Sequence, residues 1–271
     1  MPKKYPKELI NKAYNLINKE GYSLSKACEI LEVDRHTMSK RLKENFEDVK
    51  IFKDGKKEVD SNYFEVIDTE EKAYWLGFLT ADGYVSSKND IELALKASDK
   101  CHLESFKKAI KSNHKIGRKE VKLNNKIHIA YRINIRDTKM SNDLKKLGFN
   151  NEKSYNAYIP FDFIPDDLLP HYMRGLMDGD GCIVERKGGL NVTIACTKSE
   201  QLKNDIIKIF KDILDIDVHI KTDARNGLYD IRIYDKKEIS RYFNWIYKNA
   251  TVYLQRKYNK FAVLRQDRKK S

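Results

Sequence analysis

The chain lacks several features that would assign it to a common class of protein. No apolar run approaches the length of a membrane span, and the basic N-terminus has no apolar stretch or cleavage site of a signal peptide. Its four cysteines, at positions 28, 101, 182 and 196, have no C-x-x-C spacing. That scatter favours reduced thiols acting as small buried hydrophobes over a disulfide or zinc framework. We therefore expect a cytoplasmic protein without a membrane partner.

The charge balance is strongly positive. The 271 residues carry a formal net charge of +13, although 40 acidic residues are also present. A surplus of this size on a folded chain favours a polyanionic partner, because neutralising phosphates releases counterions. The alternative is a basic enzyme with an ordinary solvated surface.

Residues 1–45 predict three short helices. Apolar side chains recur at helical spacing over 7–21, 23–33 and 35–45, and Asp34 can cap the third helix. A short helix, a tight turn and a basic helix with short polar side chains are typical of a helix-turn-helix DNA-binding module. The alternative is a small helical cap with a solvated outer face. The side chains that would face DNA are Arg35, His36, Thr37, Ser39, Lys40 and Arg41.

A duplication follows an extended, basic linker predicted over residues 46–67. Residues 68–150 and 151–271 each predict the order helix, two strands, helix, two strands, helix. Gly83 and Gly181 stand just under a hundred residues apart, and Leu103 and Leu202 keep that spacing to within one residue. We infer two αββαββα repeats and an α+β fold.

The repeats open on related stretches, "WLGFLTADG" at residues 75–83 and "MRGLMDGDG" at residues 173–181. Small residues four apart on one helical face remove the side chains that hold two helices apart. Glycine inside a helix costs about 0.5–1 kcal/mol relative to alanine, so these glycines need a packing reason. We expect the two helices to cross with their backbones nearly touching. The small residues are Gly77, Ala81, Gly175 and Gly179.

Each motif ends on an acid, Asp82 or Asp180, directly before a glycine suited to a left-handed helix cap. A helix C-terminus already carries partial negative charge, so two such ends that cross would repel each other without a cation between them. Oxygen-only ligands favour magnesium-type ions, and nucleases use paired metal sites in phosphodiester cleavage. The alternative for one such stretch is an ordinary helix cap and turn.

These residues resemble the LAGLIDADG homing endonucleases, in the single-chain form with two motifs, over residues 68–265. The resemblance implies paired motif helices between two pseudo-symmetric halves, each with a saddle-shaped antiparallel sheet lying along the DNA major groove. It implies a monomer that breaks both strands of double-stranded DNA at a long asymmetric target, with Mg²⁺ as cofactor and Mn²⁺ or Ca²⁺ as substitutes in vitro. Asp82 and Asp180 would hold the metal, the four small residues would form the interface, and Lys139 and Lys237 would organise solvent at the scissile phosphates.

The two copies differ at one position, where Thr80 in the first stands opposite Asp178 in the second. Hydrogen bonding is therefore expected to differ between the halves. Bases would be read by alternating sheet residues that face DNA. The candidates for this role are Arg118, Lys122, Arg132, Arg136, Arg186, Lys221, Arg225 and Arg232.

Two other functions stay open on the same fold. A non-cleaving DNA-binding regulator could also carry a helix-turn-helix but need not keep the acids, and an intron RNA maturase would add intron RNA as a partner. An intein is disfavoured, because the chain opens on Met1-Pro2 and ends without a His-Asn pair. The six histidines show no metal-ligand spacing, which argues against a zinc-histidine nuclease.

Overall fold

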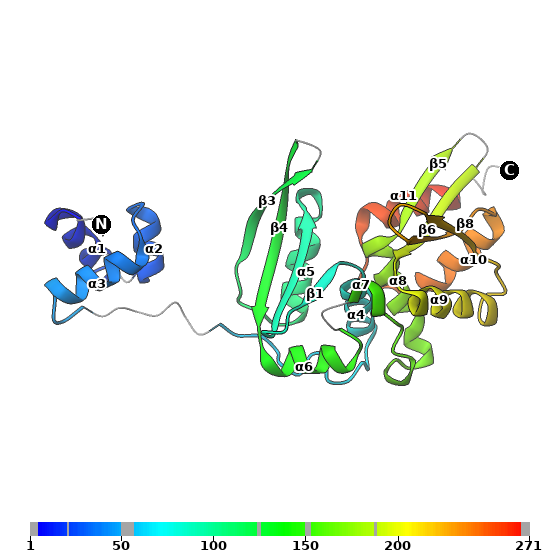
Figure 1. Ribbon diagram of the computed structural model, residues 1–271, viewed down its shortest axis with the longest axis horizontal. Coiled ribbons are helices and arrows are strands. Elements are labelled where there is room, and N and C mark those ends of the chain that lie inside the picture. The colour runs from blue at the N-terminus through cyan, green and yellow to red at the C-terminus, as the bar shows by residue number, and fades with distance from the viewer. Residues whose placement is uncertain are drawn as a thin grey trace. The chain divides into compact units, whose positions relative to one another are not determined.

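The computed structural model, drawn in Figure 1, describes residues 5–20, 22–49, 57–123, 126–149, 153–186 and 189–266. The chain divides into two compact units, Met1–Glu58 and Val59–Ser271. The division falls inside the stretch predicted as a linker. Tyr63, Phe64 and Ile67 from the second half of that stretch are buried in the core of the larger unit.

The smaller unit contains three helices, α1 (Lys7–Asn18), α2 (Leu24–Ile30) and α3 (Arg35–Asn45). Its core is made by one side of each helix and includes Ile17, Cys28 and Leu42. The predicted cap is confirmed, because the Asp34 carboxylate accepts a hydrogen bond of 2.8 Å from the N–H of Thr37. Three helices therefore form where the sequence predicts them, while their contact with DNA stays a prediction.

The larger unit contains two copies of one arrangement, which confirms the predicted α+β fold of two αββαββα repeats. Each copy has a four-stranded antiparallel sheet, in the orders β1-β2-β4-β3 and β5-β6-β8-β7. The first copy contains α4 (Glu70–Asp82), β1 (Gly83–Val85), β2 (Asp90–Lys96), α5 (Lys100–Ala109), β3 (Ile116–Leu123), β4 (Lys126–Arg136) and α6 (Thr138–Lys146). The second contains α8 (Leu169–Asp180), β5 (Cys182–Arg186), β6 (Gly189–Thr197), α9 (Glu200–Asp212), β7 (His219–Asp223), β8 (Leu228–Ile233) and α10 (Lys236–Ile246).

Shorter segments complete the larger unit. The connector between the repeats holds α7 (Lys153–Asn156) and two 3₁₀ turns, Phe161–Phe163 and Asp166–Leu168. A last helix, α11 (Gln255–Gln266), follows the second copy. In the described part of the chain, no helix is long and apolar enough to cross a membrane.

One face of each sheet is covered by helices and the other is open. Along β2, Ile91, Leu93 and Leu95 are buried and alternate with residues that reach the opposite side. Leu93 pairs with Ile133 of β4, which is also buried. Because directly paired residues share a face, this alternation defines the open face of the sheet as the one that carries the intervening residues.

The N-cap of α4 is Thr69, whose hydroxyl accepts a hydrogen bond from the Lys72 N–H at 3.3 Å. Two local predictions are wrong. Gly83 and Gly181 are extended, with φ of −79° and −71°, and form no left-handed cap. The four thiols are free, but Cys101 and Cys182 are exposed rather than buried.

Candidate functional site

The two motif helices, α4 and α8, cross at backbone contact. A Cβ atom placed on Gly77 would lie 1.9 Å from the carbonyl oxygen of Tyr172, and one on Gly175 would lie 2.0 Å from that of Tyr74. Real carbon and oxygen atoms do not approach this closely, so only glycine fits at either place. The crossing therefore fixes the relative position of the two repeats.

The same crossing brings the ends of the two motifs together. A Cβ atom on Gly179 would lie 2.3 Å from the Cβ of Ala81 and 3.4 Å from Oδ2 of Asp82. The carboxylate of Asp82 thus lies against the last turn of α8, next to Gly179, which directly precedes Asp180. Asp82 is exposed and Asp180 is half-buried, so solvent reaches both acids.

A lysine that sequence reasoning missed closes this end of α8. Lys257 of α11 is buried, and its Nζ donates to the carbonyl oxygens of Met177 at 2.7 Å, Asp178 at 2.6 Å and Gly179 at 3.2 Å. Burial lowers the pKa of Lys257 to about 8, against the charges of Asp178, Asp82 and Asp180, which raise it. The ammonium therefore neutralises the negative end of the helix that carries Asp180.

The two lysines proposed from sequence contact other acids. Lys139 of α6 forms ion pairs with Asp143 at 2.8 Å and Glu65 at 3.0 Å. Lys237 lies in the first turn of α10, where its backbone N–H donates to the capping carboxylate of Asp235. The charges of the motif acids influence Lys257 instead. In the sequence, Lys257 could have been noticed as a single charge at helical spacing between Leu254 and Phe261, which are both buried.

Thr80 and Asp178, which differ between the two motifs, each accept a hydrogen bond from a tyrosine of the opposite motif helix. The Tyr172 hydroxyl donates to Thr80 Oγ1 at 3.0 Å, and the equivalent Tyr74 hydroxyl donates to Asp178 Oδ2 at 2.9 Å. The partners are thus related by the repeat, but only one half carries a carboxyl group. Burial raises the pKa of Asp178 to about 6, although a hydrogen bond from the Leu254 N–H opposes the rise.

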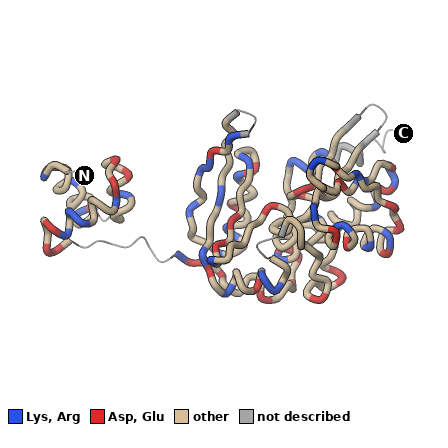
Figure 2. The backbone as a smooth tube through the Cα atoms, in the orientation of Figure 1, with Lys and Arg blue, Asp and Glu red and all other residues tan. Residues whose placement is uncertain are grey.

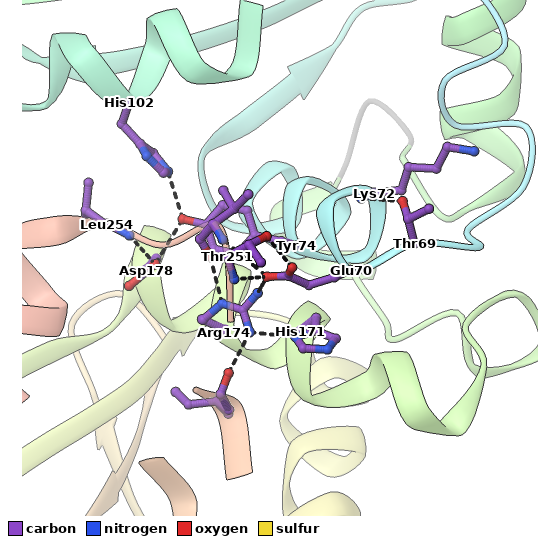
Figure 3. A network of polar contacts seen from close by, with 12 residues as sticks. Thr69, Glu70, Lys72, Tyr74, His102, His171, Arg174, Asp178, Thr251 and Leu254 are labelled. Atoms are coloured by element: carbon purple, nitrogen blue, oxygen red, sulfur yellow. Dashed lines mark hydrogen bonds and ion pairs between the residues drawn. The ribbon is translucent and has the colours of Figure 1, made fainter. Parts of the chain in front are cut away.

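The start of α4 and the middle of α8 share a buried ion pair, which Figure 3 shows at the centre of a polar network. The Arg174 side chain is fully buried and donates to Glu70 at 2.5 Å and to the carbonyl oxygens of Ile246 and Val252. Glu70 also accepts from the Thr251 and Val252 N–H groups. Burial opposes the charge of Glu70, but these hydrogen bonds and Arg174 lower its pKa. The network ties the segment before α11 to both motif helices.

His102 joins this network through Tyr74. Its Nε2 lies 2.7 Å from the Tyr74 oxygen, whose one hydrogen goes to Asp178, so the histidine donates from Nε2. Burial lowers the pKa of His102 to about 4; the nearby charge of Asp99 opposes this shift and that of Arg256 adds to it. His102 is therefore neutral at neutral pH.

We expect His102 to make folding stability depend on pH. Its pKa is about 6.5 in an unfolded chain, so below that pH the unfolded state binds a proton that the folded state does not. The stability contributed by neutral His102 is present above pH 6.5 and is lost as the pH falls toward 4. His102→Gln lacks this term, so its deficit relative to wild type should shrink by about 2 kcal/mol between pH 7 and pH 5. Urea unfolding of both proteins at each pH measures this, and a constant difference would contradict the expectation.

The first sheet divides the proposed base-reading residues between its two faces. Arg132 and Arg136 of β4 lie on the open face, because they alternate with buried Ile133 and Ile135. Arg118 and Lys122 pair with Tyr131 and Ile127, which places both on the face opposite Arg132 and Arg136, although both side chains are exposed at that end of the sheet. The structure does not bring the four together. Lys119, absent from the sequence-based set, pairs with Ala130 and belongs to the open face.

Among the side chains that the structure describes, the second sheet carries fewer exposed cations than the first. Lys221 and Arg232 share its open face with Cys182, and Arg232 forms an ion pair with Asp230. Arg225 lies in the turn between β7 and β8 and forms an ion pair with Asp223. The side chain of Arg186 lies outside the described part of the chain.

The third helix of the smaller unit presents part of its predicted set to solvent. Arg35, His36 and Lys40 are exposed, whereas Thr37, Ser39 and Arg41 are half-buried. Arg41 also forms an ion pair of 2.9 Å with Glu44. Three of the six predicted side chains are therefore exposed and available for a DNA contact.

The donor set at the crossed helices fits a divalent cation of the magnesium type. Among the side chains that the structure describes, no group of three or more His, Cys, Asp or Glu could hold a metal ion. Mg²⁺ commonly takes only one or two carboxylates and completes its shell with water and substrate phosphate oxygens. Asp82 and Asp180 supply such a pair of oxygen donors at a solvent-accessible place.

Comparisons with known proteins agree with this geometry. Residues 168–247 match the model of a LAGLIDADG-like domain. The homing endonuclease I-WcaI, solved bound to its DNA recognition sequence, has a similar structure, with a TM-score of 0.53 and 13% identity over 68% of this chain and 84% of that one. No match was found among curated proteins.

Two further solved structures are similar at lower scores. Full-length DUF199/WhiA from Thermatoga maritima has a TM-score of 0.48 and 18% identity over 77% of this chain and 65% of that one. I-SmaMI, solved with uncleaved DNA target in the presence of calcium ions, has a TM-score of 0.46 and 12% identity over 73% of this chain and 92% of that one. The resemblance predicted from the two motifs is confirmed: residues 168–247 match a LAGLIDADG-like domain, and the larger unit has the fold of a homing endonuclease.

Proposed function

We propose that this chain is a site-specific DNA endonuclease that makes a metal-dependent double-strand break at a long asymmetric target. The observation that carries the proposal is the placement of the Asp82 carboxylate against Gly179, the residue that precedes Asp180 in the last turn of α8. Two solvent-accessible carboxylates at adjoining negative helix ends favour a cation between them. The crossing that creates the site requires glycine at Gly77 and Gly175.

The residues at this end of the helices have separate roles. Asp82 and Asp180 hold Mg²⁺, with Mn²⁺ or Ca²⁺ as substitutes in vitro. When bound, the cation supplies charge for the phosphate oxygens and lowers the pKa of a bound water. Lys257 holds the end of α8 in place and adds positive charge beside both carboxylates.

DNA lies against the open faces of the two sheets in this proposal. Figure 2 shows lysine and arginine along the strands of the first sheet, with acidic residues beside them. The net charge of +13 provides the sequence-independent part of the attraction. The three helices of the smaller unit add a second contact through Arg35, His36 and Lys40. Thr80 opposite Asp178 marks the halves as different, which suits an asymmetric target and one chain per site.

A cleavage selection tests this function. The purified full-length chain is incubated with a randomised or genomic DNA library and Mg²⁺, and the new ends are sequenced. We expect one long site cut on both strands, with no cutting in EDTA. A chain that binds a defined site but cuts neither strand with Mg²⁺ or Mn²⁺ would be a DNA-binding regulator. Binding only to structured intron RNA would favour a maturase.

Substitution of Lys257 tests whether this lysine, rather than Lys139 or Lys237, supports cleavage. Lys257→Met removes the buried ammonium, and we expect cleavage to fall by about 10²-fold. It also leaves three carbonyl oxygens without this donor, so unfolding free energy should fall by about 1–3 kcal/mol. Cleavage rate at saturating DNA is measured below the melting range of the variant. Lys139→Ala and Lys237→Ala are the matched controls, and a larger loss in either would contradict the assignment.

A further inference from the structure

The open face of the first sheet carries acids as well as the cations expected of a DNA-binding surface. Asp90 and Glu92 of β2 lie on this face, because they alternate with buried Ile91 and Leu93. Both form hydrogen bonds with basic side chains of other strands in the sheet. Carboxylates at this place oppose binding to phosphates, so their presence in a protein of net charge +13 needs a reason.

Asp90 binds one arginine with both of its oxygens. It pairs across the strands with Arg136, whose Nε donates to Oδ1 at 2.9 Å and whose terminal nitrogen donates to Oδ2 at 3.0 Å. The Arg136 side chain is 69% exposed, whereas that of Asp90 is 25% exposed. Asp90 therefore holds one edge of the Arg136 guanidinium group, and the rest of that group is exposed to solvent.

Glu92 holds two cations from different strands. Its Oε1 accepts from Lys119 of β3 at 3.1 Å, and its Oε2 accepts from Arg132 of β4 at 3.2 Å. The Glu92 side chain is 24% exposed, against 40% for Lys119 and 46% for Arg132. As at Asp90, the carboxylate lies lower on the sheet than the cations that it orients.

Folding alone does not account for this arrangement, because exposed ion pairs contribute little to stability. Their effect on recognition is larger. A guanidinium group that is already held in one orientation loses less conformational entropy when it donates two hydrogen bonds to guanine O6 and N7. The carboxylate beneath it also disfavours a bare phosphate, which penalises DNA that offers no base contact in return.

We propose that Asp90 and Glu92 are specificity-determining positioning residues, which orient Arg136, Arg132 and Lys119 toward base edges of one half of the DNA target. The inference rests on the proposed function, in that it assumes DNA lies on the open face. On the open face of the second sheet, the Arg232 side chain is only 17% exposed in its ion pair with Asp230, against 69% for Arg136 in its pair with Asp90.

A binding selection tests the inference apart from cleavage. Full-length wild type and Asp90→Asn are each used to select from a randomised DNA library in EDTA, and bound sequences are counted. For Asp90→Asn we expect discrimination to fall about tenfold at one or two adjacent base pairs. Affinity for unrelated DNA should rise, with a salt dependence steeper by about one unit of log–log slope. Arg136→Lys keeps the charge but lacks the fork, and should relax the same base pairs.

Asp68→Asn is the matched control. Asp68 is an exposed acid paired with Lys72 at the opposite end of α4 from Asp82, so its loss changes charge equally without touching the open face. An unchanged base profile for Asp90→Asn, or the same change in Asp68→Asn, would overturn the inference and leave the proposed function intact. A wild type that selects no sequence would overturn both. The same selection with Glu92→Gln should relax base pairs different from those of Asp90→Asn.

Discussion

Asp180→Asn and Asp82→Asn are each expected to abolish cleavage of both DNA strands while target binding is retained. Asparagine has nearly the shape of aspartate but lacks its charge, so it keeps the helix ends packed and weakens the hold on a divalent cation. One of only two carboxylates at the crossed ends is lost in either variant, and the described part of the chain has no third acid grouped with them. We expect a fall in rate of at least about 10³-fold, the scale on which single catalytic groups act.

The measurement uses a plasmid that carries the selected target, so that nicked and linear products are resolved. Binding is measured in parallel with Ca²⁺, and thermal unfolding shows that each variant is folded. Asp217→Asn, which removes an exposed acid paired with Lys211, is the control for lost charge. Linear product formed at the wild-type rate by Asp82→Asn or Asp180→Asn would refute the proposed site.

Gly175→Ala is expected to destabilise the protein strongly, although it adds only one methyl group. The new Cβ would lie 2.0 Å from the Tyr74 carbonyl oxygen and 2.7 Å from the Phe78 nitrogen. Both are backbone atoms of α4, so no rotamer change relieves the clash, and the two helices must move apart. We expect unfolding free energy to fall by about 3 kcal/mol or more, measured by urea unfolding.

Gly117→Ala provides the comparison, because a Cβ atom there meets nothing within 4 Å. We expect Gly117→Ala to change stability by less than about 1 kcal/mol, since it adds only a methyl group on an open strand. If Gly175→Ala unfolded at the same urea concentration as Gly117→Ala, the close crossing of α4 and α8 would be refuted.

Local sequence patterns were sufficient to predict that the two motif helices cross closely, but not to predict the backbone conformation at their ends. Small residues four apart predict close approach because helical geometry puts them on one face. The prediction of left-handed caps at Gly83 and Gly181 was wrong. Glycine is needed there because a Cβ atom would clash with Leu79 or Met177, and such a close contact does not need a positive φ.

The face of the sheet on which a residue lies could be predicted only where every second residue of the strand is apolar. In β4, Ile133 and Ile135 mark the buried side, so Arg132 and Arg136 follow directly. In β3 the run "GRKEVKL" has charges in both phases, and only the pairing with β4 decides that Lys119 is on the open face and Arg118 is not. That register depends on contacts between strands that no short pattern encodes.

The contacts of Lys257 and Arg174 could not be read from sequence, because their partners are distant in the chain. Lys257 contacts α8 about 80 residues earlier, and Arg174 contacts Glu70 about a hundred residues earlier. Composition and spacing describe neighbours within a turn or two. A single charge on an apolar helix face, as at Lys257, is the one local sign that such a partner exists.

The hydrogen bonds from Thr251 to Glu70 also constrain when the protein can fold. They join residues separated by 181 positions, so the first motif helix lacks these partners until Thr251 has left the ribosome. The smaller unit has its own core and can form as soon as it emerges. Completion of the polar network around the crossed helices is thereby deferred until Thr251 has been synthesised, and a product truncated before that residue would lack the segment that contacts both motif helices.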